Sequence, residues 1–123
     1  MGKKKVLIAD DISIISDTLR MELEKMEGVE VVAIVNNIDL EYKKIIEFEP
    51  HIVITDLKFK RDTSINLIKE IQEMEKFRKL VFILITSDTE AGSIVEKNNL
   101  KISDILYKPF KYHDIVDIVE KYT

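Results

Sequence analysis

The stretch Val6-Leu7-Ile8-Ala9-Asp10-Asp11 places an uninterrupted apolar run directly before two carboxylates. A short apolar run without alternation is typical of a strand that is buried on both faces, as in a parallel sheet. Three later runs also end in chemically useful side chains: residues 52–55 precede Asp56, residues 81–85 precede Thr86, and residues 104–107 precede Lys108 and Pro109. Because the carboxyl ends of parallel strands open on one side of the sheet, we expect these side chains to converge in one crevice.

Segments with helical periodicity alternate with these runs. The first has apolar residues at helical spacing from Ile12 to Met26, and we expect Gly28 to end it. Further helices are expected at 38–46, 65–74, 89–98 and 115–122, and the first of these is capped by Asn36-Asn37 and closed by Pro50. Strands are expected at 29–35, 51–55 and 105–107, and a polar loop at 57–64. This alternation predicts an α/β fold with one doubly wound, five-stranded parallel sheet in the flavodoxin-like order 2-1-3-4-5.

Length and composition narrow the class of protein. A chain of 123 residues suits one domain, which we expect over residues 1–123. The absence of cysteine excludes disulfides and thiolate sites, and a net charge of −4 argues against direct binding of nucleic acid. No apolar run approaches the ~20 residues that span a bilayer, and no secretory pattern is present, so we expect a cytoplasmic protein with no membrane contact.

The converging side chains favour one kind of chemistry. Three carboxylates, from Asp10, Asp11 and Asp56, together with the hydroxyl of Thr86 and the ammonium of Lys108, suit a divalent metal and a phosphoryl group. Carboxylates crowded without a metal destabilise one another, so at least one pKa among them should be raised.

In order and spacing, these features resemble the receiver domain of bacterial two-component response regulators over the whole chain. The matching features are Asp10-Asp11, Asp56, Thr86, Lys108-Pro109 and the adjoining Phe110. Taken singly, each has a more ordinary explanation, such as a charge on a helix dipole, a cap or a turn. Five together, each in its place at a strand end, favour the functional interpretation.

The resemblance implies a metal site. It assigns Mg²⁺ (or Mn²⁺) to the carboxylates of Asp11 and Asp56, to Asp10 largely through water, and to the backbone carbonyl of Lys58. Magnesium prefers oxygen ligands in octahedral geometry and keeps several waters, which suits this donor set.

The resemblance also implies a phosphoryl acceptor. Asp56 would take a phosphoryl group from a sensor histidine kinase or a phosphotransfer protein, while Lys108 and Thr86 contact phosphoryl oxygens. The peptide bond before Pro109 is expected to be cis, which aims Lys108 into the crevice. The domain would then be a switch rather than a turnover enzyme, with a homodimer or partner face on the fourth helix, fifth strand and fifth helix.

The chain departs from the family pattern at several positions. The loop 57–64 lacks the usual proline and glycine, with Ser64 in place of the glycine, and its basic residues Lys58, Lys60 and Arg61 either assist docking of a phosphodonor or form a solvated loop. Ile105 stands where the family commonly has a switching aromatic residue, and the aromatic side chain is at Tyr107 instead.

Lys58 and Asp88 follow the acceptor and Thr86 by two residues each. In receivers these positions flank the path of the water that hydrolyses the acyl phosphate. We expect an ion pair between them, and our hypothesis is that self-dephosphorylation is slow.

Three alternatives compete with this interpretation. A flavodoxin would need a phosphate-binding first loop, where Asp10-Asp11 would repel the ligand. A haloacid-dehalogenase-like phosphatase needs a second aspartate two residues after its nucleophile, but Ile12 occupies that place after Asp10. A degenerate receiver would be a phosphorylation-independent interaction module. Whether an output domain follows Thr123 is left open; a DNA-binding one would make the protein a transcription regulator.

Overall fold

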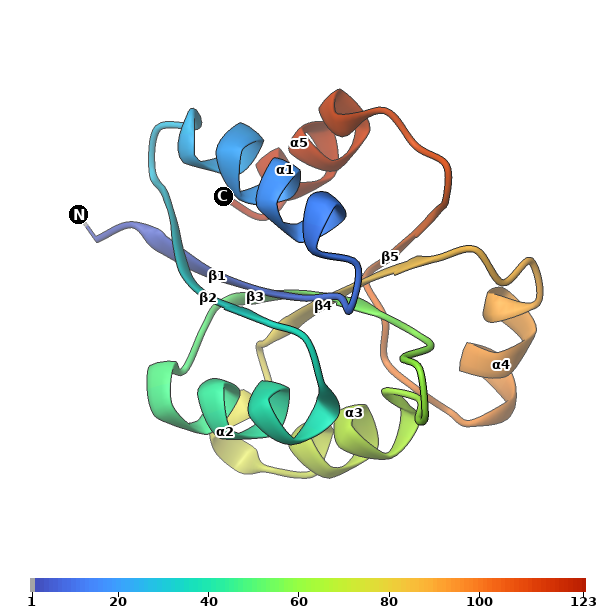
Figure 1. Ribbon diagram of the computed structural model, residues 1–123. Coiled ribbons are helices and arrows are strands. Elements are labelled where there is room, and N and C mark those ends of the chain that lie inside the picture. Colours follow the sequence, from blue (N-terminus) through green and yellow to red (C-terminus); the bar gives the residue numbers. More distant parts are fainter. Residues whose placement is uncertain (1) are drawn as a thin grey trace.

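Five parallel strands form the centre of the computed structural model, which describes residues 2–123 (Figure 1). Met1, which belongs to the expected domain 1–123, lies outside the described residues. The strands are β1 (Lys4–Ala9), β2 (Val29–Val35), β3 (Ile52–Asp56), β4 (Val81–Thr86) and β5 (Asp104–Tyr107). Their order is β2-β1-β3-β4-β5 and all pairs are parallel, which confirms the predicted topology.

Helices cover both faces of the sheet. They are α1 (Ser13–Glu24), α2 (Ile38–Phe48), α3 (Ile65–Gln72), α4 (Ala91–Lys97) and α5 (Tyr112–Glu120), and a short 3₁₀ turn, η1, spans Glu75–Phe77. Figure 1 shows α1 and α5 on one face and α2 and α3 on the other, with α4 beside β5. None of these helices in residues 2–123 is long and apolar enough to cross a membrane.

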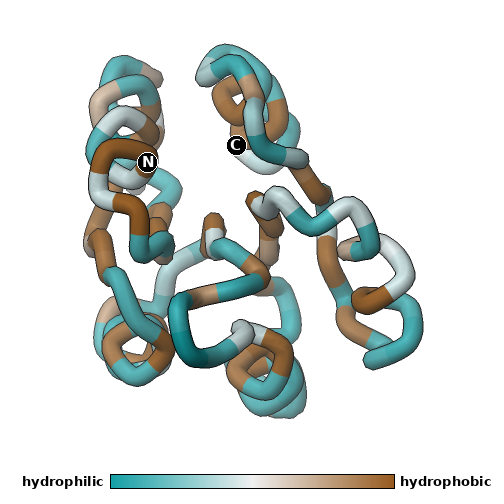
Figure 2. Tube along the Cα trace, turned by 45° about the vertical axis from the view of Figure 1, so that its right-hand side comes forward, coloured by the Kyte–Doolittle hydropathy of each residue, from teal (hydrophilic) through white to brown (hydrophobic). Residues whose placement is uncertain are grey.

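Each face of the sheet buries its own core. Residues of alternating register separate into two sets, so that Val6 and Ile8 pack toward α1 and α5 while Leu7 and Ala9 pack toward α2 and α3. The strands are therefore buried on both sides, as their continuous apolar runs predicted. The helices, in contrast, combine hydrophobic and hydrophilic residues, as Figure 2 shows, which is typical of helices that bury one side and expose the other.

Helix ends are fixed by local polar groups. Asn37 caps α2 by accepting a hydrogen bond from the Leu40 N–H at 2.9 Å, as predicted. At the other end Glu49 adopts a left-handed conformation (φ 46°), and Pro50 follows it.

Several boundaries differ from the prediction. Helix α1 ends at Glu24, so Gly28 (φ 82°) does not end the helix but lies in the turn into β2, where its carbonyl accepts from Lys4. Helix α4 is seven residues long rather than ten, because the side chain of Asp88 bonds the Glu90 N–H and forms a turn before the helix starts. His51 precedes β3 and accepts the Lys5 N–H on its ring nitrogen, and the strand extends to Asp56.

Candidate functional site at the carboxyl ends of the strands

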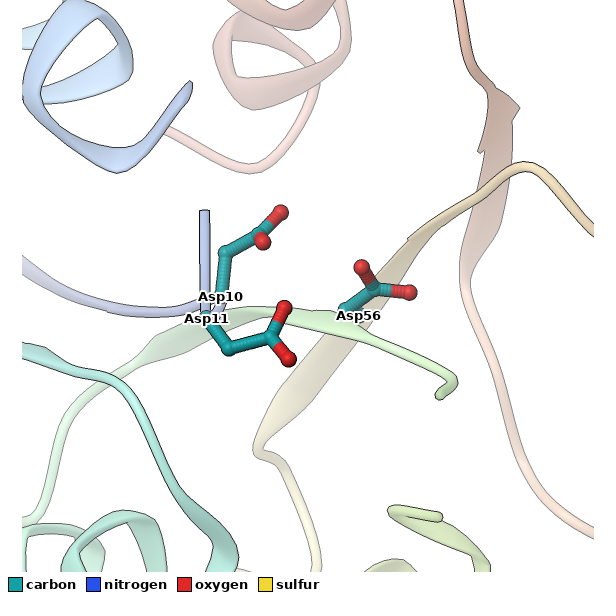
Figure 3. A group of neighbouring side chains, drawn as sticks. All are labelled: Asp10, Asp11 and Asp56. Atoms are coloured by element: carbon teal, nitrogen blue, oxygen red, sulfur yellow. The ribbon is translucent and has the colours of Figure 1, made fainter. Parts of the chain in front are cut away.

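The three aspartates gather at one edge of the sheet. Asp10 and Asp11 follow β1 and Asp56 ends β3, and these strands are neighbours in register, with Ala9 opposite Thr55. One carboxylate oxygen of each aspartate lies within 4.8 Å of the others. Figure 3 shows the Asp11 carboxylate extending toward Asp56. The structure thus brings together carboxylates that are 46 positions apart in the sequence.

Lys108 joins two of these carboxylates. Its ammonium nitrogen lies 2.9 Å from Asp10 Oδ2 and 2.7 Å from Asp56 Oδ2. Its backbone N–H donates to the Thr86 carbonyl at 2.7 Å, which fixes the chain just beyond β5. The Lys108–Pro109 peptide bond is cis, as expected. All three charged groups are largely withdrawn from water, with only 14% of the Lys108 side chain exposed.

The proton affinities reflect this crowding. Burial raises the pKa of the Asp56 carboxyl and the charge of Asp10 adds to the effect, while hydrogen bonding and charge from Lys108 partly offset it. Burial opposes the charged form of Lys108, but its bonds to Asp56 and Asp10 outweigh burial and raise the pKa of the ammonium group. The expected rise of one carboxyl pKa is confirmed, and Lys108 stays protonated.

Backbone donors orient two of the carboxylates locally. The Ile12 N–H donates to Asp10 Oδ1 at 2.8 Å, and the Lys58 N–H donates to Asp56 Oδ1 at 3.2 Å. Both bonds span two residues, which is the geometry of a turn closed by an aspartate side chain. Each of these aspartates therefore has one oxygen on the backbone and the other on Lys108.

Residues 57–64 form the predicted loop between β3 and α3, and this loop is folded into a small hairpin. Both of its ends are fully buried, at Leu57 and Ser64. Its pairing comprises a bridge between Lys58 and Thr63, a 2.7 Å bond from the Phe59 N–H to the Asp62 carbonyl, and a 2.9 Å bond from the Ser64 N–H to the Leu57 carbonyl. The carbonyl of Lys58, a predicted metal ligand, is outside these two hydrogen bonds.

The tip of the hairpin reaches the third aspartate. The Lys60 N–H donates to Asp11 Oδ2 at 3.0 Å across a separation of 49 residues. A cavity of about 470 Å³ adjoins this contact and is lined by Asp11, Asn36, Asn37, Ile38, Asp39, Phe59, Lys60, Arg61 and Asp62.

The turn after β4 is tied to the hairpin. Thr86, which is 1% exposed, ends β4, and its hydroxyl accepts the Asp88 N–H at 3.0 Å. Asp88 Oδ2 lies 2.8 Å from the Lys58 ammonium nitrogen, so the predicted ion pair is confirmed. The bond from Lys58 lowers the pKa of the Asp88 carboxyl.

Ile105 and Tyr107 occupy different surroundings on β5. Ile105 packs against the core between the sheet and α2, α3 and α4. Tyr107 is 41% exposed, and its hydroxyl lies 3.8 Å from the position that a side-chain carbon at Gly92 would take. The aromatic side chain therefore lies over the start of α4.

The sequence interpretation missed Glu41. This residue of α2 is fully buried, and in residues 2–123 its two carboxylate oxygens are the buried side-chain atoms without a hydrogen-bond partner. Burial raises the pKa of Glu41 to about 8; the Thr55 hydroxyl lowers it and the charge of Asp56 raises it further. The signal was present in the sequence, because Glu41 is three residues after Ile38 and four before Ile45, on the apolar stripe.

The donor set fits a hard divalent cation. All ligands offered by the cluster are carboxylate oxygens, and the chain has no cysteine and only two histidines, His51 and His113, neither of which belongs to the cluster. Asp11 makes no contact with a cation within the described chain, so one of its oxygens is free to bind one.

Comparisons with known proteins agree with this geometry. A family model described as the response regulator receiver domain matches residues 6–120. The chain is 29% identical over 119 residues to the uncharacterized transcriptional regulatory protein YesN of Bacillus subtilis (strain 168), covering 95% of this chain and 32% of that protein. The chain spans about a third to a half of the length of the curated relatives it matches first.

Solved structures give the same result. The REC domain of AraT, a response regulator from Geobacillus stearothermophilus, is similar with a TM-score of 0.79 and 27% identity, over 96% of this chain and 91% of that chain. The isolated REC domain of RcsB from Salmonella enterica serovar Typhimurium, determined in the presence of phosphomimetic BeF3-, has a TM-score of 0.81 and 27% identity, over 97% of this chain and 87% of that chain.

Proposed function

The chain belongs to the family of response regulator receiver domains, and on this premise we propose that it is a phosphoryl-accepting switch with Asp56 as the acceptor. Domains of this family are signalling switches of two-component systems rather than enzymes. The observation that carries the proposal is the position of Asp56, with one oxygen on Lys108 and two further carboxylates close enough to share a cation.

The proposed step is nucleophilic. An oxygen of Asp56 attacks the phosphorus of a phosphohistidine on a sensor kinase or phosphotransfer protein. The new O–P bond forms as the P–N bond breaks, and the electron pair of that bond stays on the imidazole nitrogen. The acceptor must be ionised for this attack, which the Lys108 ammonium favours.

Residues of the chain reduce the repulsion between the Asp56 carboxylate and the incoming phosphoryl group. Carboxylate and phosphoryl group repel by about 4 kcal/mol at 4 Å and an effective dielectric near 20. Lys108, already 2.7 Å from Asp56, moves its contact to a phosphoryl oxygen, and Thr86 donates its hydroxyl to another. A magnesium ion, when bound, neutralises the remaining charge; Asp11, Asp56, the Lys58 carbonyl and, through water, Asp10 would hold it.

The lifetime of the phosphorylated state is proposed to be long. Lys58 and Asp88 form their ion pair beside the acceptor, because the Lys58 N–H bonds Asp56 directly. A paired side chain at this place restricts the approach of water to the acyl phosphate. Slow self-dephosphorylation would suit a relay or a transcriptional response.

The output surface is proposed on α4, β5 and α5. As in the family, the hydroxyl of Thr86 would be pulled toward the phosphoryl group, and the turn and α4 would follow. Helix α4 is short and buries only Ala91 fully, so it is a poorly anchored element. Exposed Tyr107 lies on the same surface, which is where a homodimer or partner would bind.

Mg²⁺ and beryllofluoride test the proposal. We expect millimolar Mg²⁺ to raise the melting temperature, and beryllofluoride with Mg²⁺ to raise it further, because ligands that bind the folded state stabilise it. Asp56→Asn should keep the fold and lose the beryllofluoride response. A small-molecule phosphodonor should add one phosphoryl group to the wild type, detected by intact mass, and none to Asp56→Asn.

Melting temperatures that coincide with and without Mg²⁺ would refute the metal site. Failure of beryllofluoride and phosphodonor alike would favour a phosphorylation-independent interaction module.

A further inference from the structure

Each carboxylate of the site accepts one backbone N–H, but the donors differ in origin. The three bonds are Ile12 N–H to Asp10, Lys58 N–H to Asp56, and Lys60 N–H to Asp11. The first two close local turns and form wherever the chain turns after its strand. The third depends on where the hairpin 57–64 lies, because 49 residues separate donor and acceptor.

The hairpin holds its tip in a defined place. Its two ends are buried and paired with each other, and the Lys58 side chain adds a second attachment through Asp88. Lys60 and Arg61 form the two-residue tip. In residues 2–123 the non-glycine residues with positive φ are Glu49 and Asn99, so both tip residues have negative φ.

We infer that the main-chain N–H of Lys60 is a positioning group for the divalent cation, acting through Asp11. This inference rests on the proposed function. The bond occupies Asp11 Oδ2 and keeps the carboxylate on the side of Asp10 and Asp56, where Figure 3 shows it extending toward Asp56. Asp11 is the one member of the cluster that Lys108 does not hold, so its orientation depends on this donor.

The expected effect follows from metal-site chemistry. Hydrogen bonds to ligating carboxylates fix their rotamers before the ion arrives, and their loss costs roughly 10–100-fold in metal affinity. Because only one of several ligands is affected, we expect the lower end, about tenfold.

Lys60→Pro removes the donor at a position whose φ is negative, as proline requires. Proline lacks a backbone N–H, so the bond to Asp11 cannot form. Lys60→Ala is the matched control, since it removes the same side chain and keeps the N–H. We expect Mg²⁺ titrations, followed by backbone NMR shifts, to give about tenfold weaker binding for Lys60→Pro and unchanged binding for Lys60→Ala.

A second measurement separates positioning from general loosening of the loop. Loosening would also disturb the contacts of Ser64 with Leu57 and of Asp88 with Lys58, so without Mg²⁺ the amide NMR shifts of Ser64 and Asp88 should be the same in Lys60→Pro and Lys60→Ala. Changed shifts at both residues in Lys60→Pro, or equal Mg²⁺ affinities for the two variants, would overturn the inference while leaving the proposed function intact. Absence of Mg²⁺ binding to the wild type would overturn both.

Discussion

Two buried carboxyl groups, Asp56 at the edge of the sheet and Glu41 beneath it, meet burial in opposite ways. Asp56 has a lysine 2.7 Å from one oxygen and a backbone N–H on the other. Glu41 has no ion pair and no hydrogen bond of good geometry in the described residues, and the nearby Thr55 hydroxyl offsets its burial only in part. Burial raises both pKa values, and Glu41 reaches about 8. The difference teaches that burial alone leaves a carboxyl protonated and inert, whereas burial beside a cation keeps a carboxylate available for reaction.

The largest effect should come from removing the charge that Glu41 can acquire. Its folded pKa of about 8 lies above the unfolded value of 4.5, so the folded state holds the extra proton between these pH values. The contribution of Glu41 to the free energy of unfolding therefore falls as pH rises from about 4.5 to about 8, by at most about 1.4 kcal/mol per pH unit, and does not change further above that. Glu41→Gln should lose this pH dependence.

Urea denaturation at several pH values measures this pH dependence of the free energy of unfolding. Glu47→Gln, at an exposed position on the same helix, is the control. If the free energy of unfolding depends on pH in the same way in the wild type and in Glu41→Gln, the raised pKa of Glu41 is contradicted.

The second prediction removes the lysine from the carboxylate cluster. Lys108→Met leaves Asp10 and Asp56 without their shared partner, and we expect a loss of about 3 kcal/mol, the lower end for buried pairs because the lysine is 14% exposed. Mg²⁺ should then stabilise the variant more than the wild type, since it replaces the missing charge. Denaturation with and without Mg²⁺ tests this, with exposed Lys43→Met as the control. Equal stability of the two variants would contradict it.

The smallest effect on stability is expected for the Lys58–Asp88 pair, in which the lysine is exposed. Lys58→Ala should change the free energy of unfolding little, because ion pairs with exposed members contribute little. It should nevertheless shorten the life of the phosphorylated protein, and Asp88→Ala should do the same. The decay of the phosphorylated form, followed by intact mass, measures this, with Lys60→Ala as a neighbour that lacks the pair. An unchanged decay in Lys58→Ala would refute the role of the pair.

Much of this arrangement could be predicted from residue order alone. Continuous apolar runs predicted the strands, and the strand order placed Asp10, Asp56 and Lys108 at one end of the sheet, where the long Lys108 side chain reaches the other two from beyond β5. The Lys58–Asp88 pair also followed from position, because both residues are two beyond a strand-end residue.

Other features depend on tertiary contacts that no local pattern encodes. The hairpin 57–64 contains no glycine or proline, the residues that usually indicate a turn. Its hydrogen bond to Asp11 forms only when the sheet has brought the two segments together. The short α4 results from a side-chain turn at Asp88. Glu41 could have been found by asking which charged residue lies on an apolar helical stripe.

The salt link between Lys58 and Asp88 has a mechanical consequence. It joins the segment after Asp56 to the segment that leads into α4, so the two are coupled while the pair lasts. A displacement of the hairpin therefore alters the balance of conformations available to the turn before α4, by no more than the small free energy of the pair.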